Sequence, residues 1–329
     1  MPNRDKVLLT IVALVTAAIL LSNVDGVHAS EARGQFDRNF NVSGPVQLNV
    51  ENGSGSVNVH RGGSGNVSVH AEIRSNNWLG NVSDSDVKQI EQNPPVKQEG
   101  NNVRIYKLEG SLGRHVSINY EINVPEETTV DAHTGSGSTT VEMIKGPVTL
   151  STGSGSVRVR QIASQTQVYT GSDSIEIGDI QGPVQAKTGS GSINGEGIAG
   201  AFRGETGSGH MEVRLSAPGD VYATTGSGHI ELNGVDGKLY AHTGSGHLEI
   251  TGTPRSDWEV HSGSGGVTLH VPDNVGFDVD AHAGSGSVNV EGPITMESSM
   301  TNRHEVRGKV RGGGPRIEAT TGSGSISIE

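Results

Sequence analysis

Three consecutive repeats of the sequence place a histidine two residues before a glutamate. The pairs are His210 with Glu212, His229 with Glu231, and His247 with Glu249. Residues two apart in a β-strand lie on one face, and stacked strands repeat about every 4.8 Å, so the pairs would form one outward lattice. Imidazoles and carboxylates so arranged suit zinc or a similar divalent cation, and stacked imidazoles respond to pH. These six residues are the candidate metal or pH-sensing site; the alternative is a surface ladder whose groups only offset one another.

A second column of histidines stands two residues before a repeated Gly-Ser motif. It consists of His242, His261 and His282. We expect these three side chains to lie in consecutive coils beside the same corner. Threonines and serines also form columns around the motif, and we expect their hydroxyls to bond along the stack and brace the corner.

The elements that position these side chains recur at a short and nearly constant spacing. The first glycine of each motif stands at positions 135, 153, 171, 189, 207, 226, 244, 263, 284 and 322. A repeat this short cannot bury a core alone, so successive copies must stack as a solenoid. We interpret the last step, from Gly284 to Gly322, as two coils of which one has lost its motif. Within it, Met296–Gly314 is expected to be a loop.

Apolar residues alternate with polar ones on both sides of each motif. In one coil Val148 and Leu150 precede the motif, while Val157, Val159 and Ile162 follow it. This pattern predicts a strand, a tight Gly-Ser corner, a second strand and a looser turn. We expect both glycines of the corner to have positive φ. Asp173, which replaces the second glycine in one coil, should share that conformation.

The fold class predicted from this pattern is an all-β, right-handed parallel β-solenoid (β-helix) with coils of about 18 residues. Parallel crossovers are right-handed by strong preference, and the inward positions do not repeat every six residues as a left-handed β-helix would need. Roughly fourteen coils would make a column of about 60–70 Å. Strand edges at its open ends would require cover.

We predict a single solenoid domain over residues 30–329. Residues 132–329 would form regular coils, and residues 45–131 irregular N-terminal coils. An insertion at 75–102, containing a short helix over Asp84–Gln92, would cover the first coils.

Residues 1–29 resemble a secretory signal peptide. Arg4 and Lys6 precede the apolar run Val7–Leu21, and Val27 and Ala29 are small residues at a cleavage site. A run of about fifteen residues is shorter than the roughly 20 that span a bilayer. The mature chain is therefore expected to be exported without a stable membrane span, to the periplasm, the cell surface or the medium.

Composition excludes several classes of function. The chain has no cysteine, and its net charge of −12 with no basic block argues against nucleic acid as a partner. No phosphate-binding glycine motif and no Ser-His-Asp arrangement stands out. We predict a protein that is not an enzyme and needs no cofactor other than a possible divalent metal. A polysaccharide-processing β-helix enzyme is a further alternative.

The motifs also resemble a known family. Ile122–Pro125, Val130–Ser138 and the repeated Thr-Gly-Ser-Gly-Ser-Val units are similar to the bacterial putative-adhesin family of exported β-strand-repeat proteins, as is Gly313–Ile317 followed by Thr321–Ile326. The resemblance spans roughly residues 45–329. It implies a β-solenoid of the cell envelope without an active site. The predicted function is that of an adhesin-like or scaffold protein that binds a glycan or a protein surface through a lateral ladder face.

Overall fold

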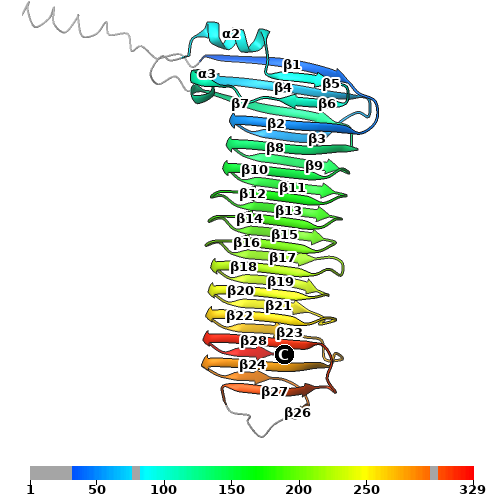
Figure 1. Cartoon of the computed structure of the whole chain (residues 1–329), viewed down its shortest axis with the longest axis vertical. Coiled ribbons are helices and arrows are strands. Elements are labelled where there is room, and N and C mark those ends of the chain that lie inside the picture. Colours follow the sequence, from blue (N-terminus) through cyan, green and yellow to red (C-terminus); the bar gives the residue numbers. More distant parts are fainter. Residues whose placement is uncertain (1–31, 76–81, 297–302) are drawn as a thin grey trace, which may run out of the picture.

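The computed structural model describes residues 32–75, 82–296 and 303–329, and the signal peptide predicted at residues 1–29 lies outside them. Two long β-sheets face each other and form the walls of an elongated column (Figure 1). In the regular coils, successive strands alternate between the two sheets, so each coil adds one strand to each wall. The predicted all-β parallel solenoid is therefore confirmed.

Fourteen described strands form the first wall, sheet A. In spatial order they are β1 (Arg33–Asn41), β4 (Asn66–Ser75), β7 (Val116–Val124), β3 (Val57–Arg61), β9 (Thr139–Ile144), β11 (Val157–Ile162), β13 (Ile175–Ile180), β15 (Ile193–Ile198), β17 (Met211–Leu215), β19 (Ile230–Val235), β21 (Leu248–Gly252), β23 (Val267–His270), β29 (Ile326–Ile328) and β25 (Val288–Val290).

The second wall, sheet B, contains fifteen described strands. Their order is β26 (Ile294–Met296), β27 (Glu305–Val310), β24 (Phe277–Ser285), β28 (Arg316–Ser323), β22 (Trp258–Ser264), β20 (Leu239–Ser245), β18 (Val221–Ser227), β16 (Phe202–Thr206), β14 (Val184–Thr188), β12 (Thr166–Thr170), β10 (Val148–Ser154), β8 (Thr128–Ser136), β2 (Val46–Ser54), β6 (Asn102–Ile105) and β5 (Val96–Glu99). Two helices, α2 (Asp84–Gln92) and α3 (Gly110–His115), lie near the N-terminal end.

The register of the strands confirms the predicted coil length. Val148 of β10 pairs with Thr166 of β12, and Val157 of β11 pairs with Ile175 of β13, both in parallel. The predicted inward positions are buried between the sheets, as Leu150 and Val159 illustrate with 0% exposure. Apolar side chains of both walls thus share one continuous core.

A left-handed residue explains why the burial alternation breaks near the end of five second strands, β9, β11, β13, β15 and β19. Met143, Gln161 and Asp179 have φ of 61°, 56° and 55°, and glycines take the equivalent position at 197 and 234. The backbone turns there, so the next residue, Ile162 in one coil, faces inward instead of outward. This turn leads the chain across to sheet B.

The corner glycines are required mainly for a different reason than the sequence suggested. The first glycines do not have positive φ, and Asp173 does not either, so that expectation is wrong for them. Among the second glycines, Gly137 has positive φ and Gly155 does not. Instead, coils approach so closely that a Cβ on Gly153 would lie 2.7 Å from the carbonyl oxygen of Gly135. Asp173 is accommodated with its carboxylate accepting a hydrogen bond from the next backbone N–H, at 2.8 Å.

The threonines before the corner brace the stack as expected. Thr170, Thr188 and Thr206 donate their hydroxyl protons to carbonyl oxygens of the preceding coil, over 3.0, 2.9 and 2.8 Å. These threonines are buried, so each bond satisfies a hydroxyl that water does not reach.

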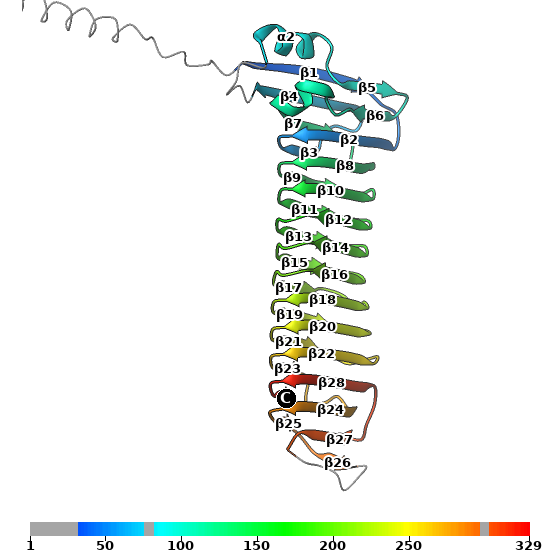
Figure 2. The same cartoon turned by 60° about the vertical axis from the view of Figure 1, so that its left-hand side comes forward.

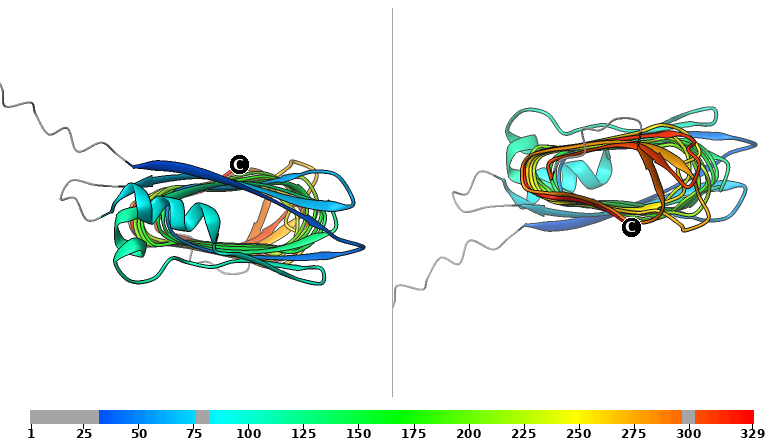
Figure 3. Two further views of the ribbon diagram at one scale, coloured as in Figure 1. Left: turned by 90° about the horizontal axis from the view of Figure 1, so that it is seen from above. Right: turned by 90° about the horizontal axis from the view of Figure 1, so that it is seen from below.

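The N-terminal end of the column is covered by antiparallel strands and a helix. Strand β1 pairs with β4, which pairs with β7, both antiparallel. Helix α2 has the bounds expected from the sequence, begins at the Ser83 cap, and buries Val87 and Ile90 as it lies across this end (Figure 3). The remainder of the predicted insertion includes β5, and residues 76–81 lie outside the described chain.

The C-terminal coil does not stack in chain order. Strand β28 lies between β22 and β24, and β29 lies between β23 and β25 (Figure 2). The step from Gly284 to Gly322 therefore contains no lost coil, because the coils of these two glycines are direct neighbours. The step from Gly263 to Gly284 is longer than the regular spacing by about three residues, which at about 3.3 Å each suffice to cross one further spacing of about 4.8 Å. The last coil fills the level left open.

Residues 297–302 of the expected loop lie outside the described chain, but residues 305–310 form a strand that closes this end. Strand β27 pairs antiparallel with β24 on one side and with β26 on the other. It covers the sheet edge that β24 would otherwise expose. None of the helices in the described ranges is both long and apolar enough to cross a bilayer.

Candidate binding groove and histidine ladder

The histidines of the His-x-Glu repeats lie together on the corner that leads into sheet A. His210, His229 and His247 precede β17, β19 and β21, each by one residue. The rings of His210 and His229 stack with centroids 5.1 Å apart and planes within 6°. The structure thus brings these imidazoles into the predicted column.

Backbone hydrogen bonds fix the protonation state that this column requires. The His229 N–H donates to Nδ1 of His210 over 3.1 Å, and the His247 N–H donates to Nδ1 of His229 over 2.9 Å. An accepting Nδ1 carries no proton, so these two hydrogen bonds require the tautomer with the proton on Nε2. In an earlier coil a serine does the same: the Ser192 hydroxyl oxygen accepts from the His210 N–H at 3.3 Å.

The glutamates of the repeats do not point to these histidines. Glu212 pairs with Arg214 at 3.2 Å, and Glu231 accepts from Asn233 at 2.9 Å. Glu249 lies 3.7 Å from His270. Within residues 32–75, 82–296 and 303–329, no group of three or more His, Asp or Glu side chains is placed to hold a metal ion. Zinc binding at this lattice stays a prediction without support from the geometry.

The second histidine column is interrupted. His242 and His261 are neighbours across β20 and β22, but Thr320 of β28 separates His261 from His282. The Thr320 hydroxyl lies 2.6 Å from Nδ1 of His261. The expectation of three consecutive coils is wrong, because the C-terminal coil enters the stack there.

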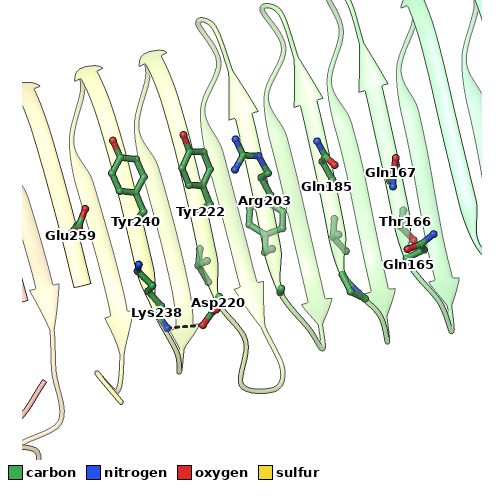
Figure 4. Close-up of a pocket in the computed structure, with 15 residues that line it drawn as sticks. Gln165, Thr166, Gln167, Gln185, Arg203, Asp220, Tyr222, Lys238, Tyr240 and Glu259 are labelled. Carbon is green, nitrogen blue, oxygen red and sulfur yellow. Dashed lines mark hydrogen bonds between the residues drawn. The ribbon is translucent and has the colours of Figure 1, made fainter. Parts of the chain in front are cut away.

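A groove crosses the outer face of sheet B, from β12 to β22. It has a volume of about 550 Å³. Its upper row is formed by one outward residue from each of six neighbouring strands, four residues before the corner glycine (Figure 4): Gln167, Gln185, Arg203, Tyr222, Tyr240 and Glu259. A second row lies at the start of the same strands: Gln165, Pro183, Ala201, Asp220 and Lys238.

The centre of the groove is an aromatic stack. The guanidinium carbon of Arg203 lies 3.9 Å from the ring centroid of Tyr222, and the Tyr222 and Tyr240 rings stack at 5.0 Å with planes within 11°. Beyond Tyr240, the His261 ring lies with its centroid 6.1 Å from that of Tyr240 and its plane tilted by 59°. Cation–π and ring contacts of this kind hold side chains in one orientation, so the groove is preorganised.

Charges beside the groove are paired. Glu205 contacts Lys187 at 3.1 Å and also binds Arg203. Partial burial opposes ionisation of Glu205, but hydrogen bonds from Lys187 and Arg203 hold its pKa below the ordinary value. The same hydrogen bond from Arg203 to Glu205 raises the pKa of Arg203. Arg203 therefore stays cationic and fixed over Tyr222.

The sequence contains a pattern that indicates this groove, although it involves tyrosines and not the histidines and carboxylates from which the candidate site was predicted. Tyr222 and Tyr240 occupy the same position in consecutive coils, and the chain has only five tyrosines. Because consecutive coils stack in register, two aromatic residues at the same coil position come into ring contact. Phe202 of β16 also lines the groove, with 1% exposure, and lies next to Gly204, where a Cβ would lie 2.8 Å from the Phe202 ring.

Comparison with known proteins places the C-terminal part of the chain. Residues 202–329 match the Toastrack DUF4097 family model. The matched segment contains the histidine ladder, the aromatic stack and the C-terminal coil that stacks out of chain order. The Gln165–Ala201 side of the groove lies before it. The match agrees with the expected resemblance to β-strand-repeat proteins at the level of the fold.

A solved structure is also similar to this chain. A crystal structure described as a "putative cell adhesion protein from Clostridium sporogenes" is similar over 90% of this chain and 99% of that chain, with 14% sequence identity and a TM-score of 0.28. No curated protein matches the sequence.

Proposed function

We propose that the protein is an exported, non-catalytic, adhesin-like or scaffold module of the bacterial envelope, which binds a glycan or protein surface across the outer face of sheet B. The observation that carries this proposal is the groove with its preorganised aromatic stack. Concave sites lined by aromatic and polar groups are the usual places for ligands. Export is supported by the basic and apolar pattern of residues 1–29.

The architecture supports binding more than turnover. The groove is built on strands within a regular stack, and its side chains hold one another in place. A rigid row of this kind offers many weak contacts along a long ligand. Enzymes of the polysaccharide-processing type would instead release shorter products, which is a measurable difference.

The test uses mature protein comprising residues 30–329 and a panel of immobilised glycans and envelope proteins. Tyr240→Ala should weaken capture of the ligand by about tenfold or more, because it removes one ring of the stack. Tyr106→Ala is the matched control, since Tyr106 is also an exposed tyrosine, with 38% exposure, but lies outside the groove. Equal binding by both variants, or no binding by the parent protein, would contradict the proposal. Release of shortened glycan would contradict its non-catalytic part.

A second candidate, a pH-responsive envelope module, is favoured by the histidine ladder. Imidazoles that accept backbone hydrogen bonds between coils lose these bonds when they are protonated. If the module instead responds to a metal, a chelator should lower its stability or release its ligand. An adhesin of the first type should keep its ligand with chelator present.

A further inference from the structure

We infer that the ligand of the sheet B groove is an uncharged glycan chain that lies along the axis of the stack. This inference rests on the proposed binding function of the same face. The charge, the hydrogen-bonding groups and the backbone of the groove each favour such a ligand.

The groove is electrically balanced within a strongly acidic chain. Its lining contains two cations, Arg203 and Lys238, and two carboxylates, Asp220 and Glu259, which sum to zero. The whole chain carries −12. Arg203 is already paired with Glu205, and the Lys238 backbone N–H donates to Asp220 over 3.0 Å. A polyanion or a polycation would find no surplus of opposite charge here, whereas a neutral polymer is complementary in charge.

The polar groups of the groove match hydroxyls. Gln165, Gln185 and Tyr240 each offer a donor and an acceptor on side chains that line the groove. Sugar hydroxyls also donate and accept, so each of these side chains can form a hydrogen bond with a hydroxyl in either role. Pro183 and Ala201 add apolar surface between the polar groups, which suits the C–H faces of a sugar ring.

The backbone of the groove disfavours an extended peptide. Peptides that bind sheets add a strand at an edge and gain main-chain hydrogen bonds. Strands β14, β16, β18 and β20 are each paired on both sides, so their ladders are complete. The groove lies on the face of these strands, where only side chains are offered.

The size of the row predicts a dependence on ligand length. The upper row crosses six strands, and five spacings of about 4.8 Å make a run of about 24 Å. Binding should therefore strengthen as a neutral oligosaccharide lengthens, and level off once the chain spans the row. Monosaccharides should bind too weakly to detect, because each contact in the row is small.

The experiment titrates the mature protein with neutral dextran, mannan and linear β-glucan oligomers of increasing length, with polygalacturonate as the anionic probe and an extended peptide library as the protein probe. At least one neutral glycan should bind, with little change between low and high salt, since no ion pair is formed. Gln185→Ala and Tyr240→Ala should each weaken binding by about tenfold or more, the size expected for one lost hydrogen bond or ring contact. Tyr106→Ala should leave it unchanged.

Tyr240→Phe guards against loss of folding as an explanation. It keeps the ring stack, so circular dichroism and the unfolding midpoint should match the parent protein while binding weakens. Salt-sensitive binding of the anionic probe alone, or of peptides alone, at this face would overturn the glycan inference and leave the proposed function intact. Failure of every probe to depend on Tyr240 would overturn both.

Discussion

Most corner glycines lie directly against the equivalent glycine of a neighbouring coil. The carbonyl oxygen of Gly135 occupies the space that a Cβ on Gly153 would need, and the same holds at the second glycine of the corner. The close approach of the coils thus favours glycine at these positions, although Asp173 is accommodated at one of them, whereas a left-handed φ adds to the requirement only at some second glycines, such as Gly137. The sequence identified the right residues, but the reason for them lies in the stack.

Gly209→Ala tests this explanation at a single residue. A Cβ there would overlap the carbonyl oxygen of Gly191, so we expect a loss of about 2–4 kcal/mol in the free energy of unfolding, in the upper range for single substitutions. Denaturant titration measures it. Gly65→Ala is the control, because no atom lies within 4 Å of its added Cβ. Equal stability of the two variants would contradict the steric explanation.

Serine and histidine form one continuous ladder along the corner of sheet A. The Ser174 oxygen accepts from the Ser192 N–H, the Ser192 oxygen from His210, Nδ1 of His210 from His229, and Nδ1 of His229 from His247. Serine and neutral imidazole do the same work here, but only imidazole loses its acceptor on protonation. The ladder therefore has a pH-sensitive half, in which histidines accept, and a pH-insensitive half, in which serines accept.

Acidification from about pH 7.5 to 5, across the usual range of imidazole titration, should weaken only the histidine half. A protonated imidazole cannot accept a hydrogen bond at Nδ1, so the bonds from the His229 and His247 N–H groups are lost when the rings of His210 and His229 are protonated. We expect the protection of the His229 and His247 amides against hydrogen exchange to drop, after correction for intrinsic rates. The His210 amide, which donates to Ser192, should keep its protection.

The double variant His210→Ser with His229→Ser completes this test. It keeps an acceptor in each coil and should remove the pH dependence. Nearby charges on the same strands, Glu212 and Arg214 on β17 and Glu231 on β19, are unchanged in the variant. Retention of the acid sensitivity would assign it to these charges or to other groups.

The whole molecule departs from chain order at its C-terminal end. Strand β28 fills a level between β22 and β24 on one wall, and β29 fills the matching level between β23 and β25 on the other. Each edge of the inserted coil gains a full set of parallel partners. The antiparallel strand β27 then protects the outer edge of β24.

Engineered disulfides distinguish this order from sequential stacking. The parent chain has no cysteine, so His261→Cys with Thr320→Cys introduces one possible pair. Because these residues are direct neighbours, the pair should oxidise readily, within the roughly 4.4–6.8 Å Cα separation that a disulfide needs. His261→Cys with His282→Cys, two strand spacings apart, should stay reduced. Peptide mapping with and without reductant reads the result, and a disulfide in the second variant alone would contradict the insertion.

The sequence by itself determined the features that repeat within one coil. The coil period, the two strands and their inward positions, and the helix over Asp84–Gln92 are all readable locally, because alternation and capping depend on residues close in the chain. It also identified the column of His210 and His229, because equal positions in consecutive coils must meet.

Only the tertiary structure decided which coils are neighbours, and therefore which side chains from different coils are in contact. The insertion of β28 separated His261 from His282, and the paths of individual side chains turned Glu212 and Glu231 away from the histidines. The groove likewise exists only once six strands lie side by side. The alternation of apolar and polar residues along the chain predicts which residues face outward. Stacking order and side-chain packing decide which of those outward residues share one surface.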